Sequence, residues 1–272
     1  MIETVKEMLS FTFINRALIV GVLVSLCAAL LGVSLVLKRY AMIGDGLSHV
    51  GFGILTIAMA FGIAPLLLAI PGVVVFAIML LKIGNNHKVK SDSAIAIISS
   101  SALAIGVAVT SLTTGMNTDV CNFMFGSILA MSKSDVYLSV LISIIVLILF
   151  IVYYRKLFII TFDEDFAKAS GLNVRKYTNI IAILTAIVIV IGMRMMGTLL
   201  ISSIIIFPAL TSIRLFKSFK MVVISSGCIS VLSFLIGLYL SYSYDISTGA
   251  TIVIVNLILF IIFSILSKII YD

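Results

Sequence analysis

Long apolar runs separated by short polar connections make up most of this chain. The hydrocarbon core of a bilayer takes roughly 20 apolar residues per helical crossing, so runs of that length predict transmembrane helices. Nine such helices are predicted, over residues 17–37, 42–62, 65–81, 94–114, 136–154, 178–193, 195–213, 221–241 and 246–267. The count becomes eight if one weak segment does not cross. A shorter apolar stretch, 120–132, predicts an interfacial or re-entrant helix.

The composition excludes a soluble fold. The chain is 62% hydrophobic and 11% charged, whereas soluble domains average roughly 45–50% apolar and about 25% charged residues. Its three cysteines stand singly inside apolar runs, so they predict neither a disulfide framework nor a thiolate zinc site. Glu3 and Glu7 precede the first run without a basic region, which argues against a cleaved signal peptide. We therefore expect an all-α polytopic protein of the cell membrane, with residues 1–272 forming one transmembrane domain.

The basic residues predict the orientation. Fourteen of the eighteen Lys and Arg fall on one side of the predicted bundle, at Lys38 and Arg39, in connections 82–90, 155–176 and 214–220, and at Lys268. Basic loops mark the cytoplasmic side of a membrane protein, and nine crossings then place the N-terminus outside. The net charge of +7 is explained by these loops, so no nucleic-acid partner is expected.

The connection 155–177 predicts a short polar helix. Thr161 and Glu164 have the spacing of a capping box, which predicts a helix over 162–170 that stops at Gly171. The neighbouring acidic residues suit the positive end of that helix, so we do not predict a metal site from them.

The connection that follows Pro208 is basic and aromatic. It carries Arg214, Phe216, Lys217, Phe219 and Lys220. This pattern alone is equally typical of a protein-docking surface and of a positive-inside anchor.

Apart from the Tyr40 phenol, Asp45 and His49 are the only ionisable side chains between Arg39 and Lys82. Their i, i+4 spacing puts carboxylate and imidazole on one helix face. Ionisable groups inside a membrane are usually functional, and these two types together suit zinc, manganese or iron. Metal or proton handling is one interpretation; the other is a structural pair near a helix start, where a carboxylate is favourable. Small residues around the pair predict close helix packing there: Gly44, Gly46, Ser48, Gly51 and Gly53.

One helix supplies only two ligands, whereas zinc prefers four and manganese often takes six. A two-fold homodimer would bring a second Asp45 and His49 to the same point. The sequence contains no G-x-x-x-x-G-K-[ST] phosphate loop, so ATP binding of that type is not expected in this chain. We predict no catalytic residues and no permanently bound cofactor.

Four ordered motifs carry a family resemblance. Residues 38–50, Lys-Arg-Tyr-Ala-Met-Ile-Gly-Asp-Gly-Leu-Ser-His-Val, are the first, followed by the acidic segment 162–171, the Gly-to-Pro-Ala span 197–209, and Asp-Ile-Ser-Thr-Gly-Ala at 245–250. Together they resemble the zinc/manganese/iron permease family of ABC importers over most of the chain.

This resemblance implies a permease of the cobalamin-importer type. Such a permease works as a homodimer with two cytoplasmic ATPase subunits and an extracytoplasmic metal-binding protein. The resemblance places Asp45 and His49 in the metal path, and the segment after Pro208 in the ATPase contact. An ion- or proton-coupled secondary carrier that uses Asp45 and His49 is the alternative. The sequence leaves the choice among zinc, manganese and iron open.

Overall fold

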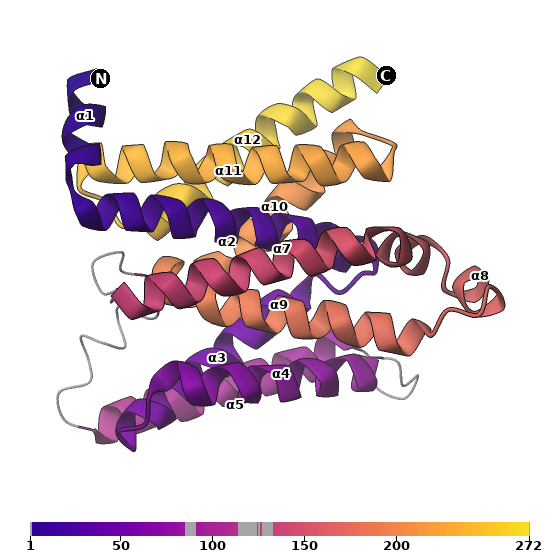
Figure 1. Cartoon of the computed structure of the whole chain (residues 1–272), viewed down its shortest axis with the longest axis horizontal. Coiled ribbons are helices and arrows are strands. Elements are labelled where there is room, and N and C mark those ends of the chain that lie inside the picture. Colours follow the sequence, from indigo (N-terminus) through magenta and orange to yellow (C-terminus); the bar gives the residue numbers. More distant parts are fainter. Residues whose placement is uncertain (1, 85–90, 114–123, 125, 127–132, 272) are drawn as a thin grey trace.

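In the computed structural model, every regular element of the described residues is a helix (Figure 1). The structure describes residues 2–84, 91–113, 124, 126 and 133–271, and the predicted helix over 120–132 lies outside them apart from residues 124 and 126. The helices are α1 (Ile2–Ser10), α2 (Thr12–Leu37), α3 (Met42–Ala60), α4 (Pro65–Gly84), α5 (Ser91–Leu112), α7 (Lys133–Phe162), α8 (Glu164–Ala169), α9 (Val174–Met196), α10 (Thr198–Leu215), α11 (Phe219–Tyr244) and α12 (Thr248–Tyr271).

All nine predicted apolar segments are helical in the structure. Among the described residues, eight helices are long and apolar enough to cross a membrane: α2, α3, α4, α5, α7, α9, α11 and α12. The ninth segment, α10, is a shorter apolar helix. The polytopic all-α fold with eight or nine spans is therefore confirmed, and α1 is an additional helix that the apolar pattern did not predict.

The helices form two groups, one packed around α2 and the other around α3, and both α9 and α10 contact the two groups. α2 packs against α7, α9, α10 and α11, whereas α3 packs against α4, α5, α9 and α10. Large apolar side chains remain exposed on α7 and α12, such as Ile151 at 69% and Ile254 at 53%. In water these surfaces would be unfavourable, but lipid chains can cover them.

α10 begins inside the bundle rather than at its end. Gly197, with φ 87°, breaks the chain between α9 and α10, a conformation that favours glycine. Gly192 packs against Ile201 and Val24, and Val24 lies near the middle of α2. Further along, Ile205 approaches Gly32, so α10 runs parallel to α2 from the middle of the bundle.

The basic connections meet at one end of the bundle. Lys38, directly after α2, forms an ion pair with Glu164 of α8 at 2.6 Å, and Phe219 at the start of α11 packs against Phe158 and Phe162 near the end of α7. We call this end, where α8 projects (Figure 1), the basic end. At the opposite end, Arg194 of α9 pairs with Asp135 of α7 at 2.6 Å.

The capping-box prediction for the acidic connection is wrong in its details. α7 continues to Phe162, and Thr161 donates from its hydroxyl to the carbonyl of Leu157 one turn earlier. The cap of α8 is Asp163, whose carboxylate accepts from the amide of Phe166 at 2.8 Å. The predicted stop is confirmed: Gly171 has φ 77°, and Leu172 donates to the carbonyl of Ala167, as in a Schellman motif.

Candidate functional site

Asp45 and His49 lie on one face of α3, within its first two turns. His49 Nε2 is 3.8 Å from Asp45 Oδ1, and the two side chains are 13% and 38% exposed. This separation is too long for a hydrogen bond, so the imidazole faces the carboxylate without being bonded to it. His49 Nδ1 is buried and has no hydrogen-bond partner within the described part of the chain. The predicted shared face is therefore confirmed, and the two side chains lie within ion-pair distance; metal or proton handling and the structural pair both stay predictions.

A third side chain reaches this site from α10. Ser202 is 7% exposed, and its hydroxyl donates to Asp45 Oδ1 across 3.5 Å. The same carboxylate oxygen thus lies next to both His49 and Ser202. Ser202 has no distinguishing signal in the sequence, because it stands in one of many apolar segments that contain serines.

Glycines allow the helices around the site to approach closely, as the sequence predicted. A Cβ added at Gly53 would lie 2.6 Å from the carbonyl oxygen of Ala102 in α5, and one at Gly46 would lie 2.6 Å from the Ile95 side chain. Real Cβ atoms do not come so near to a neighbouring atom, so only glycine fits at these contacts. α3 is therefore packed closely against α5 beside the site, while the Asp45 side chain stays 38% exposed.

The donor atoms at this site are of types that would suit a divalent metal ion. Carboxylate and imidazole bind divalent transition metals, and a hydroxyl can add a neutral oxygen. Within the residues that the structure describes, no three His, Cys, Asp or Glu side chains are arranged so that they could hold one metal ion. One copy of the chain therefore supplies only part of the ligand set that a zinc or manganese ion requires.

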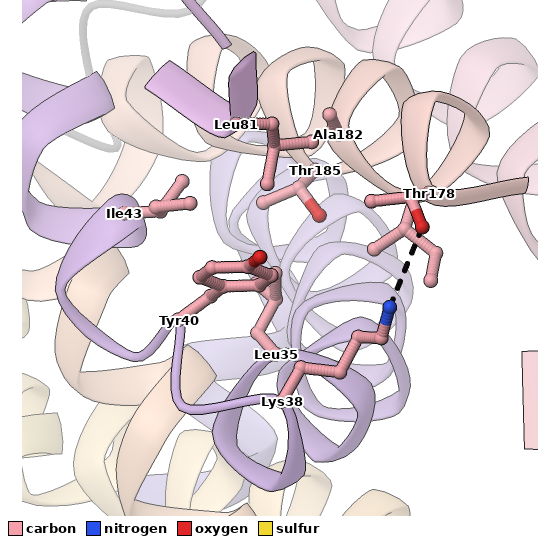
Figure 2. A pocket seen from close by; sticks show the side chains of 9 residues that line it. Leu35, Lys38, Tyr40, Ile43, Leu81, Thr178, Ala182 and Thr185 are labelled. Carbon is pink, nitrogen blue, oxygen red and sulfur yellow. Dashed lines mark hydrogen bonds between the residues drawn. The ribbon is translucent and has the colours of Figure 1, made fainter. Parts of the chain in front are cut away.

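A small pocket lies near the start of α3, at the basic end (Figure 2). Lys38, Tyr40, Thr178 and Thr185 point toward it, among apolar side chains of α2, α3, α4 and α9. Lys38 donates to Thr178 at 3.4 Å and to Glu164 at 2.6 Å. Burial, together with the Glu164 carboxylate, raises the pKa of Tyr40. The turn between α2 and α3 is thereby held by polar contacts to α8 and α9.

The segment predicted to dock a partner is exposed only in part. Arg214, Lys217 and Lys220 are exposed at the basic end, Phe216 is half-buried, and Pro208 and Phe219 are buried. Phe219 contacts Tyr154, Phe158 and Phe162 of α7. This burial gives Phe219 a packing role within the chain.

Arg214 connects α10 to the last helix of the chain. Its guanidinium donates to Ser264 of α12 at 3.1 Å and lies over the Phe260 ring, 4.9 Å from the centroid. Ser267 in turn donates to the Arg214 carbonyl at 2.8 Å. Arg214 therefore holds the end of α10 against α12 within the chain.

Comparisons with known proteins agree on one family. The model of the ABC 3 transport family matches residues 10–267. The chain is 30% identical over 260 residues to the manganese import system permease protein ScaB of Streptococcus gordonii, which covers 96% of this chain and 93% of that protein. It is 31% identical over 253 residues to the high-affinity zinc uptake system membrane protein ZnuB of Haemophilus influenzae, with 93% and 97% covered.

A solved structure supports the same assignment. PsaBC from Streptococcus pneumoniae in complex with a Fab superimposes with a TM-score of 0.87 at 30% identity, and the match covers 97% of this chain and 95% of that chain. The likeness extends over nearly the whole bundle, so it includes α3, α10 and the basic end.

Proposed function

The chain belongs to the ABC 3 transport family, and on this premise we propose that it is the membrane-spanning permease subunit of an ATP-driven importer for divalent transition metal ions. Manganese and zinc are the expected cargo, since relatives over nearly the whole chain are named for these two metals. Iron is a further candidate, because a site of Asp and His suits it as well.

The observation that carries this proposal is the convergence of Asp45 and His49 on one face of α3, 3.8 Å apart. Two protein ligands alone bind a metal ion weakly. Weak binding is compatible with transport, because the ion must also dissociate from the site. A second copy of the chain, related by a two-fold axis beside this site, would add another Asp45 and His49. Two carboxylates and two imidazoles would then hold the ion during its passage.

Energy for transport must come from another subunit. The sequence has no phosphate-binding loop of the G-x-x-x-x-G-K-[ST] type, and family membership implies a separate cytoplasmic ATPase. The family match also favours this importer over an ion- or proton-coupled secondary carrier. We further propose that an extracytoplasmic metal-binding protein delivers the ion at the end where Arg194 pairs with Asp135.

We propose that the ATPase dimer docks on the basic end. The exposed part of the segment after Pro208, with Lys217 and Lys220, supplies positive charge. α8 projects from the same end of the bundle (Figure 1) and exposes Phe166 at 59% next to acidic side chains. An exposed aromatic ring flanked by charges is typical of a protein interface, so α8 joins the predicted segment as a second part of this docking surface.

A transport assay tests the proposed function. Cells that carry the complete transporter are compared for uptake of radiolabelled Mn²⁺ and Zn²⁺ with the wild-type chain, with Asp45→Asn and with Asp92→Asn. Asp92 is an exposed carboxylate in the first turn of α5 and serves as the control. We expect Asp45→Asn to abolish metal uptake and Asp92→Asn to leave it unchanged. Normal uptake by a correctly assembled Asp45→Asn variant would contradict the proposal.

A further inference from the structure

We propose that Ser202 of α10 is a third metal ligand in each subunit, and that its hydroxyl oxygen biases the site toward manganese over zinc. The inference rests on the proposed function, in which Asp45 and His49 bind the transported ion. Ser202 lies on a different helix from Asp45 and His49, and its hydroxyl oxygen gives a chemical reason for a preference between manganese and zinc.

The positions of three atoms support this assignment. Asp45 Oδ1 is 3.5 Å from Ser202 Oγ and 3.8 Å from His49 Nε2. Ligand atoms bound at about 2.0–2.2 Å to one ion stand about 3.0–3.5 Å apart at octahedral or tetrahedral angles. The separation from Ser202 lies at the upper limit of that range and the separation from His49 exceeds it by a few tenths of an ångström, so small side-chain rotations would bring both atoms and Asp45 Oδ1 onto one ion.

The backbone holds Ser202 at this place. α10 begins at the Gly197 break within the bundle, which sets Ser202 in its second turn beside the start of α3. Gly32 meets the carbonyl of Ile205 in backbone contact, and Gly44 lies in van der Waals distance of the Ile205 side chain. α10 is thus fixed between α2 and α3. Because Ser202 is 7% exposed, its hydroxyl is directed into protein rather than toward lipid.

The metal preference follows from the type and number of donors. Hydroxyl oxygen is a hard, neutral ligand that suits manganese, and manganese accepts an octahedral set of six. Zinc prefers four ligands in a tetrahedron. Three donors from each of two copies would provide the six positions, so removal of the serine oxygens leaves a four-donor set that suits zinc better.

Uptake of the two metals tests this assignment in cells with the complete transporter. The variants are Ser202→Ala, Ser202→Cys and, as matched control, Ser203→Ala on the same helix. We expect Ser202→Ala to lower the ratio of Mn²⁺ to Zn²⁺ affinity by about tenfold, the lower end of what altered metal shells lose. Ser202→Cys retains the side-chain size and replaces oxygen by soft sulfur, so we expect a larger shift toward zinc. Ser203→Ala should keep the wild-type ratio.

Direct binding provides the second measurement. The purified complex is titrated with Mn²⁺ and followed by the electron paramagnetic resonance signal of the bound ion, which reports coordination independently of transport. An unchanged ratio of the two metals in both Ser202 variants would overturn the inference, including the case where uptake of both falls equally because Ser202 only orients Asp45. Failure of the proposed function itself is distinct, since Asp45→Asn would then also transport normally.

Discussion

Lys38 and Glu164 join the end of α2 to the start of α8 through an ion pair of 2.6 Å. The lysine side chain is only 5% exposed, whereas the glutamate is 47% exposed. Lys38 is followed by Arg39, whose φ of 63° turns the chain toward α3, and Asp45 lies one turn into that helix. The ion pair therefore connects α8, part of the proposed docking surface, to the helix that carries the proposed metal ligands Asp45 and His49.

Removal of the carboxylate should destabilise the protein more than removal of both partners. Glu164→Gln leaves a nearly buried ammonium without its counter-charge, and we expect a loss of about 1–3 kcal/mol. The double variant Glu164→Gln with Lys38→Met removes the buried charge and should recover part of that loss. Thermal unfolding of the purified protein measures both effects. Equal stability of the single and double variants would show that the pair is not coupled.

The orientation of the bundle predicts which positions a membrane-impermeant thiol reagent can reach. Ser170, after α8, lies at the basic end, and Ser243, near the end of α11, lies at the opposite one; both are exposed. In a chain whose native cysteines are replaced by alanine, we expect Ser170→Cys to react only after the cytoplasmic side is opened. Ser243→Cys should react in intact cells. Labelling of Ser170→Cys from outside would reverse the proposed topology.

The docking surface predicts that two separate changes release the ATPase. Lys217→Glu together with Lys220→Glu reverses exposed charge, and Phe166→Ala removes the exposed ring of α8. We expect each to reduce the amount of ATPase that co-purifies with the permease, without lowering its thermal stability. Phe219→Ala is the contrasting variant: its ring is buried against α7, so we expect a loss of about 3–5 kcal/mol of stability. Full ATPase retention by both surface variants would exclude this surface.

Backbone contact between α2 and α10 predicts an unequal response of two glycines. A Cβ at Gly32 would collide with the Ile205 carbonyl, whereas one at Gly44 would only touch the end of the Ile205 side chain at 3.5 Å. We expect Gly32→Ala to cost about 1–3 kcal/mol through overpacking, and Gly44→Ala to be tolerated. Thermal stability of the two variants measures the difference, and a tolerated Gly32→Ala would mean that α10 can shift.

The sequence predicts those features that local pattern determines. Apolar runs of membrane length placed all nine helical segments, and the i, i+4 spacing placed Asp45 and His49 on one face of α3. Burial of Phe219 was not predicted, because an aromatic residue between lysines is typical of an exposed loop. Its partners are rings of α7, and such a contact has no local signal.

Two further features depend on contacts that the pattern does not contain. Ser202 meets Asp45 only because the break at Gly197 starts α10 inside the bundle. The prediction that Thr161 caps a helix was wrong because α7 extends to Phe162. The Thr161 hydroxyl donates to the carbonyl of Leu157 within α7 instead. Helix ends and distant side-chain contacts follow from packing, so they require the structure.

The proposed metal site predicts a stability that depends on the cargo ion. A ligand that binds only the folded state stabilises it by about 2.7 kcal/mol at a concentration one hundred times its Kd. We therefore expect Mn²⁺ or Zn²⁺ to raise the Tm of the assembled wild-type protein, and to raise it little in Asp45→Asn or His49→Ala. Without metal, the variants should unfold near the wild-type temperature, because Nε2 and Oδ1 are 3.8 Å apart, beyond hydrogen-bond distance, and the amide oxygen in Asp45→Asn can still accept from Ser202.

The alternative interpretation, a structural pair, predicts the opposite result in the same experiment. If Asp45 and His49 stabilise each other, each single variant should lower the Tm in the absence of metal, and the double variant should recover part of the loss. The metal-dependent rise would then be equal in all four proteins. A rise that disappears with either side chain, in variants that are stable without metal, requires that both side chains bind the ion, since packing alone cannot make stability depend on dissolved Mn²⁺ or Zn²⁺.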